Sequence, residues 1–284
     1  MLIFSFGVVL TLIPLKVESI LPILYSKFWT PKECGFSPSS INTIYQIAGG
    51  VKTQLSFPWF VVLKSYKKDI AHCGGALVTR KHVITAAHCY DVDQSEAFWR
   101  KQYTVYVDVP DNCNIGRDTD ILSQKRVVIH PKFKRINIYT KIDKIYDIAI
   151  IKLNQKTKKM PICLPSTHEQ RPTIGKIIGY GVTEYKTQKR YCKLREANVR
   201  ILSDQICRTY SSIQNYYRTD HLCASSNISD TCQGDSGGPL QTFIEGRYVL
   251  SGVVSFGLGC ADATSPGIYT NVIDHIDWIK RNIK

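Results

Sequence analysis

Residues 229–240 read SDTCQGDSGGPL, and this stretch places one serine, Ser236, between an aspartate and a pair of glycines. A serine hydroxyl is a weak nucleophile at neutral pH. It needs a base within hydrogen-bond distance, and that base needs an acid to orient it. Composition alone cannot select these partners, because the chain has 7 histidines and many aspartates. The sequence around each candidate therefore has to identify them.

Two further segments supply the candidates, His88 in VITAAHC and Asp147 in YDIAIIKL. Together with GDSGGP around Ser236, they resemble the signatures of the chymotrypsin-like serine proteases, in that family's chain order of His, Asp and Ser. The resemblance covers residues 47–284. It implies an all-β fold of two packed antiparallel six-stranded β-barrels with the catalytic cleft between them. In that cleft Ser236 would be the nucleophile, His88 the general base and Asp147 the acid that orients it.

The resemblance also assigns the groups around the nucleophile. The backbone N–H groups of Gly234 and Ser236 would form the oxyanion hole. Asp230 matches the floor of the primary specificity pocket, where a carboxylate favours Arg or Lys side chains as in trypsin. A chymotrypsin-like or elastase-like preference is the alternative, and Asp230 argues against it. The other pocket residues that the resemblance implies are Ser255, Gly257 and Gly267.

Activation of a zymogen is a further implication of the resemblance. Cleavage before Ile47, in the segment YQIAGG, would free an amine that inserts and pairs with the buried carboxylate of Asp235. Gln46 precedes this bond, so a trypsin-like activator should not cut there. Three alternatives stay open: an activating protease of different specificity, cleavage at another bond, and a chain that remains a zymogen.

Hydrophobic patterning independently predicts a β-rich body. Short apolar runs such as PWFVVL, YTVYVDV and VLSGVVSFG alternate with turn residues, as in all-β barrels and sandwiches. The C-terminal segment VIDHIDWIKRNIK differs, because its apolar residues fall at helical spacing. It predicts a C-terminal helix that packs through Val272, Ile276, Ile279 and Ile283.

The N-terminal region divides the chain into three parts. Residues 1–19 form an apolar run that resembles a signal peptide. A membrane anchor is the alternative, but Pro14 and Lys16 cut the run well short of the roughly 20 apolar residues that span a bilayer. Residues 20–46 are expected to be a short leader, and residues 47–284 the protease domain. The protein is therefore expected to be secreted, without a membrane span.

Cysteine usage fits an oxidising compartment, because the chain carries 10 cysteines behind the expected signal peptide. No close CxxC or HxxxH pair occurs, so no metal site and no cofactor are expected. The pairs that the resemblance implies are Cys34–Cys163, Cys73–Cys89, Cys207–Cys223 and Cys232–Cys260. This leaves Cys113 and Cys192, which lie in loops that are neighbours in the implied fold. They are expected to pair with each other, with one or two free thiols as the alternative.

The charge balance is strongly basic, with 37 Lys and Arg against 23 Asp and Glu, a net charge of +14. Such a surface either keeps the protein solvated or attracts acidic partners. Basic residues cluster in 132–144, 152–159 and 186–195, which makes an acidic polysaccharide a candidate partner; no specific nucleic-acid partner is expected. Asn227 begins the sequon Asn-Ile-Ser and is a candidate for N-glycosylation.

These patterns predict a secreted, trypsin-like serine endopeptidase made as a zymogen. Its partners would be protein or peptide substrates, an activating protease and protein inhibitors. The sequence loosely resembles secreted arthropod proteases of venom, saliva or haemolymph. The alternative from another class is a non-catalytic protein that binds polyanions on a protease fold. Such homologues usually lose the serine or the histidine, and this chain keeps both.

Overall fold

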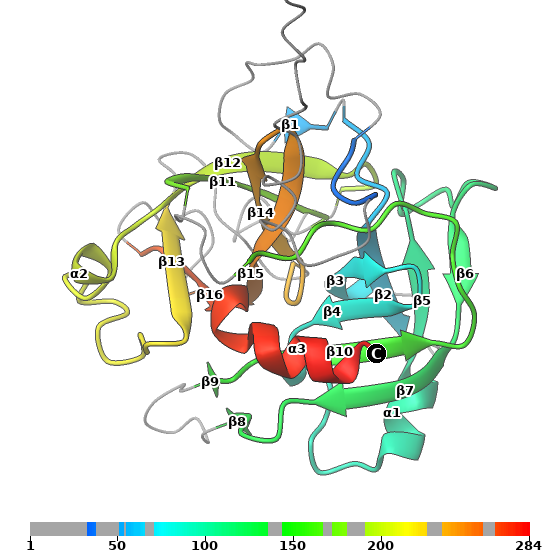
Figure 1. Ribbon diagram of the computed structural model, residues 1–284, viewed down its shortest axis with the longest axis horizontal. Coiled ribbons are helices and arrows are strands. Elements are labelled where there is room, and N and C mark those ends of the chain that lie inside the picture. Colours follow the sequence, from blue (N-terminus) through cyan, green and yellow to red (C-terminus); the bar gives the residue numbers. More distant parts are fainter. Residues whose placement is uncertain are drawn as a thin grey trace, which may run out of the picture.

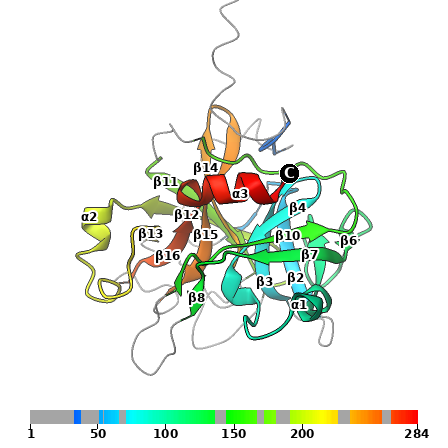
Figure 2. The same cartoon turned by 60° about the horizontal axis from the view of Figure 1, so that its bottom comes forward.

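The computed structural model describes residues 33–37, 51–53, 55–65, 71–135, 144–166, 172–180, 191–225, 235–257 and 265–284. The described residues form two antiparallel sheets of seven strands, one mainly from the first half of the chain and the other, apart from one N-terminal strand, from the second half. Figures 1 and 2 show them side by side, with a C-terminal helix across both. The predicted all-β fold of two barrels with a terminal helix is confirmed.

The first sheet has the strand order β6-β5-β2-β3-β4-β10-β7. Only Ser123 separates β6 from β7, so the two act as one bent strand and the sheet returns on itself as a six-stranded barrel. In β5 the burial alternates along the strand, which is the period of two expected when one face meets a core. The strands of this first sheet are β2 (Phe60–Ser65), β3 (Ala71–Thr79), β4 (His82–Thr85), β5 (Tyr103–Val107), β6 (Asp120–Leu122), β7 (Gln124–Ile129) and β10 (Ala149–Leu153).

The second sheet has the order β1-β12-β11-β14-β15-β16-β13, and an additional β12–β13 pairing closes six of these strands into a barrel. The extra strand β1 pairs with β12 at the edge. A chain segment that precedes the first barrel therefore adds to the second. The strands are β1 (Val51–Lys52), β11 (Ile174–Gly179), β12 (Arg195–Ile201), β13 (His221–Ser225), β14 (Pro239–Ile244), β15 (Arg247–Phe256) and β16 (Gly267–Asn271).

The remaining elements are short. A two-stranded ribbon is formed by β8 (Lys134–Arg135) and β9 (Lys144–Ile145), and a 3-10 turn η2 (Ala87–Cys89) follows β4. The strand-like patterns did not predict helices α1 (Glu96–Gln102) and α2 (Asp204–Cys207), which begin at serines, Ser95 and Ser203, whose side chains accept backbone N–H groups. The chain ends with η3 (Val272–His275) and α3 (Ile276–Asn282).

The two barrels share a buried interface. Trp59 is fully buried and donates its indole N–H to Gln241 Oε1 at 2.8 Å, across 182 residues of sequence. Its ring also lies 5.5 Å from that of Tyr248 in β15. The terminal helix adds to the same core, because the four apolar residues of its predicted stripe are all buried. This packing fixes the orientation of the two barrels relative to each other.

Within the described part of the chain, no helix combines the length and apolar character needed to cross a membrane.

Candidate active site

Asp147 lies in the link between β9 and β10, and its side chain is completely buried. Its Oδ1 accepts the backbone N–H of His88 at 2.8 Å, and its Oδ2 lies 2.7 Å from His88 Nδ1. Ser255 donates its hydroxyl to the same Oδ2 at 2.5 Å. A buried carboxylate needs such donors, since an unpaired charge in the interior is costly. Three hydrogen bonds therefore hold the Asp147 carboxylate in place, pointing at His88.

His88 lies in η2, directly after β4, where the Cys73–Cys89 disulfide ties the turn to β3. Its side chain is 13% exposed, so the ring reaches solvent while its Nδ1 side faces the buried Asp147. An ionised carboxylate can only accept, so Nδ1 carries the proton and Nε2 of the neutral ring is left as an acceptor. That is the tautomer a general base requires.

Ser236 lies in the turn before β14, and it is held against the first barrel by backbone contacts. Its carbonyl oxygen accepts the N–H of Gly74 in β3 at 2.7 Å. It also lies 3.9 Å from the sulfur of Cys89, the residue after His88. The serine is thus joined to strand β3 and to the turn η2 that contains His88. Because Ser236 belongs to the second barrel and both of its partners belong to the first, only the packing of the barrels brings these residues together.

Glycine is required directly after the serine. Gly237 has φ +80°, a left-handed conformation that side chains disfavour. A Cβ there would lie 2.3 Å from Thr85 Oγ1 and 2.7 Å from the carbonyl oxygen of Gly74. Thr85 itself donates to that carbonyl at 2.7 Å. The glycine pair in the DSGG stretch therefore permits the close backbone approach that seats Ser236.

Asp235 packs against Gly179, the last residue of β11. Its Oδ1 lies 1.9 Å from the position that a Cβ of Gly179 would occupy, so the missing side chain of Gly179 makes room for the carboxylate. Its carbonyl oxygen accepts the N–H of Gly238 at 2.8 Å, which tightens the turn around Ser236.

The expected pocket residues are partly described. Ser255 is buried near the end of β15, and Gly257 follows that strand. Gly267 begins β16, which pairs with β15. Ser255 also makes a contact that the sequence did not predict, because its hydroxyl donates to Asp147 Oδ2. Sequence patterns missed Thr270, whose hydroxyl donates to the Asp147 carbonyl at 2.9 Å; no local motif marks it. The expected residues outside the described part are Gln46, Ile47, Asn227, Asp230, Cys232, Gly234 and Cys260.

Four of the expected disulfides are bonded: Cys34–Cys163, Cys73–Cys89, Cys113–Cys192 and Cys207–Cys223. Among the described residues, two groups of side chains come close enough to share a metal ion, one around His88 and one around Asp111. Each contains two cysteines that are already joined in a disulfide, so neither offers the thiolates that bind metals.

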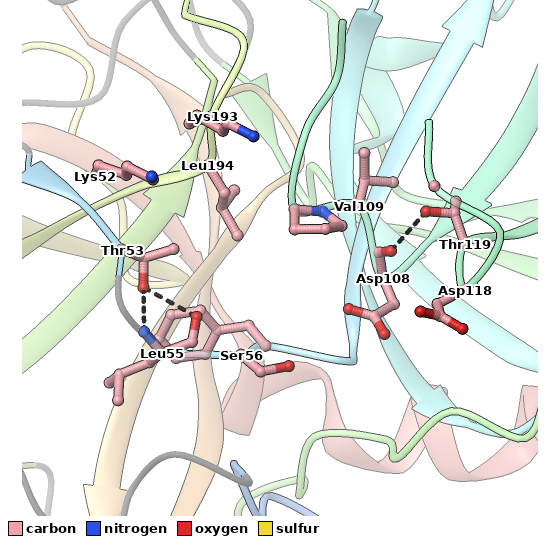
Figure 3. Close-up of a pocket in the computed structure, with 13 residues that line it drawn as sticks. Lys52, Thr53, Leu55, Ser56, Asp108, Val109, Asp118, Thr119, Lys193 and Leu194 are labelled. Carbon is pink, nitrogen blue, oxygen red and sulfur yellow. Dashed lines mark hydrogen bonds between the residues drawn. The ribbon is translucent and has the colours of Figure 1, made fainter. Parts of the chain in front are cut away.

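A cavity of about 400 Å³ lies apart from His88, Asp147 and Ser236, none of which lines it. Figure 3 shows the amines of Lys52 and Lys193 on one side of it and the carboxylates of Asp108 and Asp118 on the other. Two of these charges are already paired. Lys193 lies 2.7 Å from Asp111 and Asp108 lies 2.8 Å from Lys159.

Comparisons with known proteins agree with this geometry. The family model named Trypsin matches residues 47–279. The beta subunit of clotting factor G from Tachypleus tridentatus is 31% identical over 271 residues, which cover 88% of this chain and 82% of that protein.

Proposed function

Because the chain belongs to the trypsin family of serine proteases, we propose that it is a secreted serine endopeptidase that hydrolyses peptide bonds after Arg or Lys. The observation that carries the proposal is the doubly hydrogen-bonded pair of His88 and Asp147. The carbonyl of Ser236 bonds β3 and contacts the turn η2 that contains His88.

The chemistry follows from this arrangement. Ser236 Oγ attacks the carbonyl carbon of the scissile bond while His88 Nε2 takes its proton. Asp147 keeps the proton on Nδ1 and stabilises the imidazolium that forms. His88 then returns the proton to the leaving amine, and water hydrolyses the acyl-enzyme by the same steps. The N–H groups of Gly234 and Ser236 stabilise the oxyanion, a contribution of about 3–4 kcal/mol for one such donor in a related chemistry.

Preference for Arg and Lys rests on Asp230, six residues before Ser236. A carboxylate at the floor of a deep pocket pairs with a long cationic side chain and leaves a neutral one unsatisfied. Gly257 and Gly267 carry no side chain that would narrow such a pocket.

Activation would follow cleavage between Gln46 and Ile47, by a protease that accepts Gln before the cut. The new amine of Ile47 would pair with Asp235, which lies beside the nucleophile. The leader would stay attached, because Cys34 is bonded to Cys163 and Gly35 exchanges backbone hydrogen bonds with Pro161 and Tyr248. Disulfides of this number persist in oxidising compartments, which supports secretion with residues 1–19 as signal peptide.

The test uses protein cleaved before Ile47 and peptides that differ only at the residue before the cut: Arg, Lys, Phe, Ala or Gln. Turnover confined to Arg and Lys, and absent in Ser236→Ala, supports the proposal. Turnover of Phe or Ala peptides would support protease activity but reject the assigned specificity for Arg and Lys. No turnover from folded protein with a free Ile47 amine would reject the enzyme.

A basic cavity favours polyanion binding as a second property. The turn between β3 and β4, strand β10 and the end of α3 enclose about 600 Å³. One lining carboxylate, Glu33, lies 3.7 Å from Arg80, and both side chains are more than half exposed, so this pair is weak. The backbone carbonyls of Arg80 and Lys81 accept N–H groups from Thr157 and Leu153 at 2.8 Å each, which holds the cationic turn in place. The cationic residues that line the cavity are Arg80, Lys81, Lys152, Lys156 and Lys284.

Heparin, as a sulfated polysaccharide, is a suitable probe. A variant carrying Arg80→Gln, Lys81→Gln and Lys156→Gln should elute from a heparin column at lower salt than the wild type. The control removes the same charge elsewhere, with Gln at three exposed basic residues that do not line the cavity: Arg100, Lys101 and Lys125. Equal elution of the two triple variants would assign heparin retention to net charge and reject a site.

A further inference from the structure

The segment that carries Asp147 has an unusual backbone. Tyr146 has φ +56°, a left-handed conformation that is unfavourable for a residue with a bulky side chain. The N–H of Ile148 bonds back to the carbonyl of Tyr146 at 2.8 Å, so Asp147 lies at the centre of a three-residue turn. Such conformations persist only where surrounding groups hold them, and they are often found at functional sites.

Several hydrogen bonds hold this turn, and a carboxylate accepts one of them. The carboxylate of Asp220 accepts the N–H of Tyr146 at Oδ2, 2.8 Å away. His130 donates its backbone N–H to the carbonyl of Ile148 at 3.1 Å. Hydrogen bonds to a charged acceptor are roughly twice as strong as those between neutral groups. Of these two contacts, the one to Asp220 is made by a carboxylate side chain.

Asp220 is itself fixed in the second barrel. It directly precedes β13 and its carbonyl accepts the N–H of Asn271, the last residue of β16, at 2.9 Å. Its side chain thus reaches from one barrel to the catalytic turn of the other. The residue is only 9% exposed, and an aspartate in such a place needs a partner for its charge.

The neighbouring rings of His221 and His275 are not hydrogen-bonded to the Asp220 carboxylate. The Nε2 atoms of His221 and His275 each lie 3.8 Å from the carboxylate oxygens, beyond hydrogen-bond distance. Burial lowers the pKa of His275, with Asp220 opposing this and His221 adding to it. Burial also lowers the pKa of His130 to about 4, helped by His275, Lys132 and Arg281 and opposed by Asp220. At pH 7 His130 and His275 are therefore neutral, so neither ring brings a positive charge to the Asp220 carboxylate.

The rings of His130 and His275 also pack against the side chain of Tyr146. His130 stacks on it with ring centroids 4.9 Å apart and planes 8° apart, and His275 lies edge-on at 5.7 Å. Trp278 of α3 lies behind His130 at 4.8 Å. The ring contacts and the bound N–H therefore restrain Tyr146, and with it the turn.

From this geometry we infer that Asp220 is a positioning residue for catalysis: by binding the Tyr146 N–H, it holds the turn that directs the Asp147 carboxylate at His88. The inference rests on the proposed function, because this positioning matters for turnover only if His88 and Asp147 act in it. Asp220 does not touch the reacting atoms and acts through Tyr146.

The test compares Asp220→Ala, Asp220→Asn and Asp277→Ala in activated protein. The alanine removes the acceptor, so kcat should fall by about 10–100-fold while KM stays near the wild-type value, as expected when a catalytic group is displaced. Asparagine keeps an oxygen acceptor and should restore most of the lost kcat. Asp277 is an exposed carboxylate on α3, and its loss should leave kcat unchanged. If the alanine variant does not fold, Asp220→Ser replaces it, because the shorter hydroxyl cannot reach the position of Oδ2.

A second readout does not depend on turnover. The proton between His88 Nδ1 and Asp147 gives a far-downfield NMR resonance when the pair is aligned. It should weaken or move in Asp220→Ala and remain in Asp220→Asn. Wild-type kcat and an unchanged resonance in Asp220→Ala would overturn the inference and leave the proposed function standing. A wild type without turnover would instead reject the proposed function, and the resonance would still decide the role of Asp220.

Discussion

Asp147 binds His88 at two atoms, the backbone N–H through Oδ1 at 2.8 Å and ring Nδ1 through Oδ2 at 2.7 Å. The first bond fixes the main chain of the histidine and the second fixes its ring. Because both acceptors belong to one buried carboxylate, the position of the base and its tautomer are set together.

Asp147→Asn should leave the fold intact and lower kcat by about 10⁴-fold, the size of effect seen when this acid is replaced in a related enzyme. An amide can donate as well as accept, so it allows the ring to adopt the wrong tautomer. The measurement is kcat on an Arg peptide, with circular dichroism as the check on folding. A loss of less than tenfold would contradict the assignment of Asp147 as the orienting acid.

Gly179→Ala should sharply reduce activity, because its Cβ would occupy the space of the Asp235 carboxylate, 1.9 Å away. Displacing Asp235 moves the turn that carries Ser236 and, in the proposed mechanism, removes the partner of the Ile47 amine. The matched control is Gly116→Ala, where no atom lies within 4 Å of the added carbon. Hydrolysis of an Arg peptide by both activated variants is the measurement, and equal rates would argue against a role for Asp235.

Removing the Cys113–Cys192 disulfide should lower stability without abolishing activity. The bond joins residues 79 apart in sequence, and losing such a crosslink typically costs about 2–4 kcal/mol. Neither cysteine contacts His88 or Asp147. Thermal unfolding of the double serine variant is the measurement. Lys193→Gln serves as the comparison, because its ion pair with Asp111 is largely exposed on the lysine side and should contribute little. A midpoint equal to that of Lys193→Gln would show that the disulfide adds no stability.

Acid should destabilise the fold in part through His82. Burial, and then the charges of Lys152 and Lys81, lower the pKa of His82 from 6.5 to about 4. The unfolded chain therefore binds the proton first as the pH falls. The contribution of the neutral ring to the free energy of unfolding is complete above about pH 6.5 and is lost progressively as the pH falls towards 4.

The variant His82→Asn tests this prediction, because its amide can still reach Thr79, which bonds His82 Nδ1 at 2.8 Å. Denaturant unfolding at pH 7 and pH 4.5 gives the loss of stability for each protein. The wild type should lose more than the variant over this interval. Equal losses would assign the acid sensitivity to other groups.

The sequence alone determined the parts of this protein that local pattern encodes. Alternating and continuous apolar runs predicted the strands, and the stripe from Val272 to Ile283 predicted the terminal helix, because burial on one face imposes a period on the chain. The motifs around His88, Asp147 and Ser236 identified the family. The pattern did not predict short helices such as α1, because one or two turns of helix contain too few residues to show a hydrophobic period.

Only the tertiary structure decided which distant groups support the catalytic pair. Ser255 bonds Asp147 across 108 residues, and Asp220 bonds Tyr146 across 74. Each contact joins one barrel to the other, so it exists only after the barrels pack. Tyr146 begins the YDIAIIKL segment, but Asp220 lies in no motif, because a carboxylate that binds a backbone N–H leaves no pattern in the residues beside it.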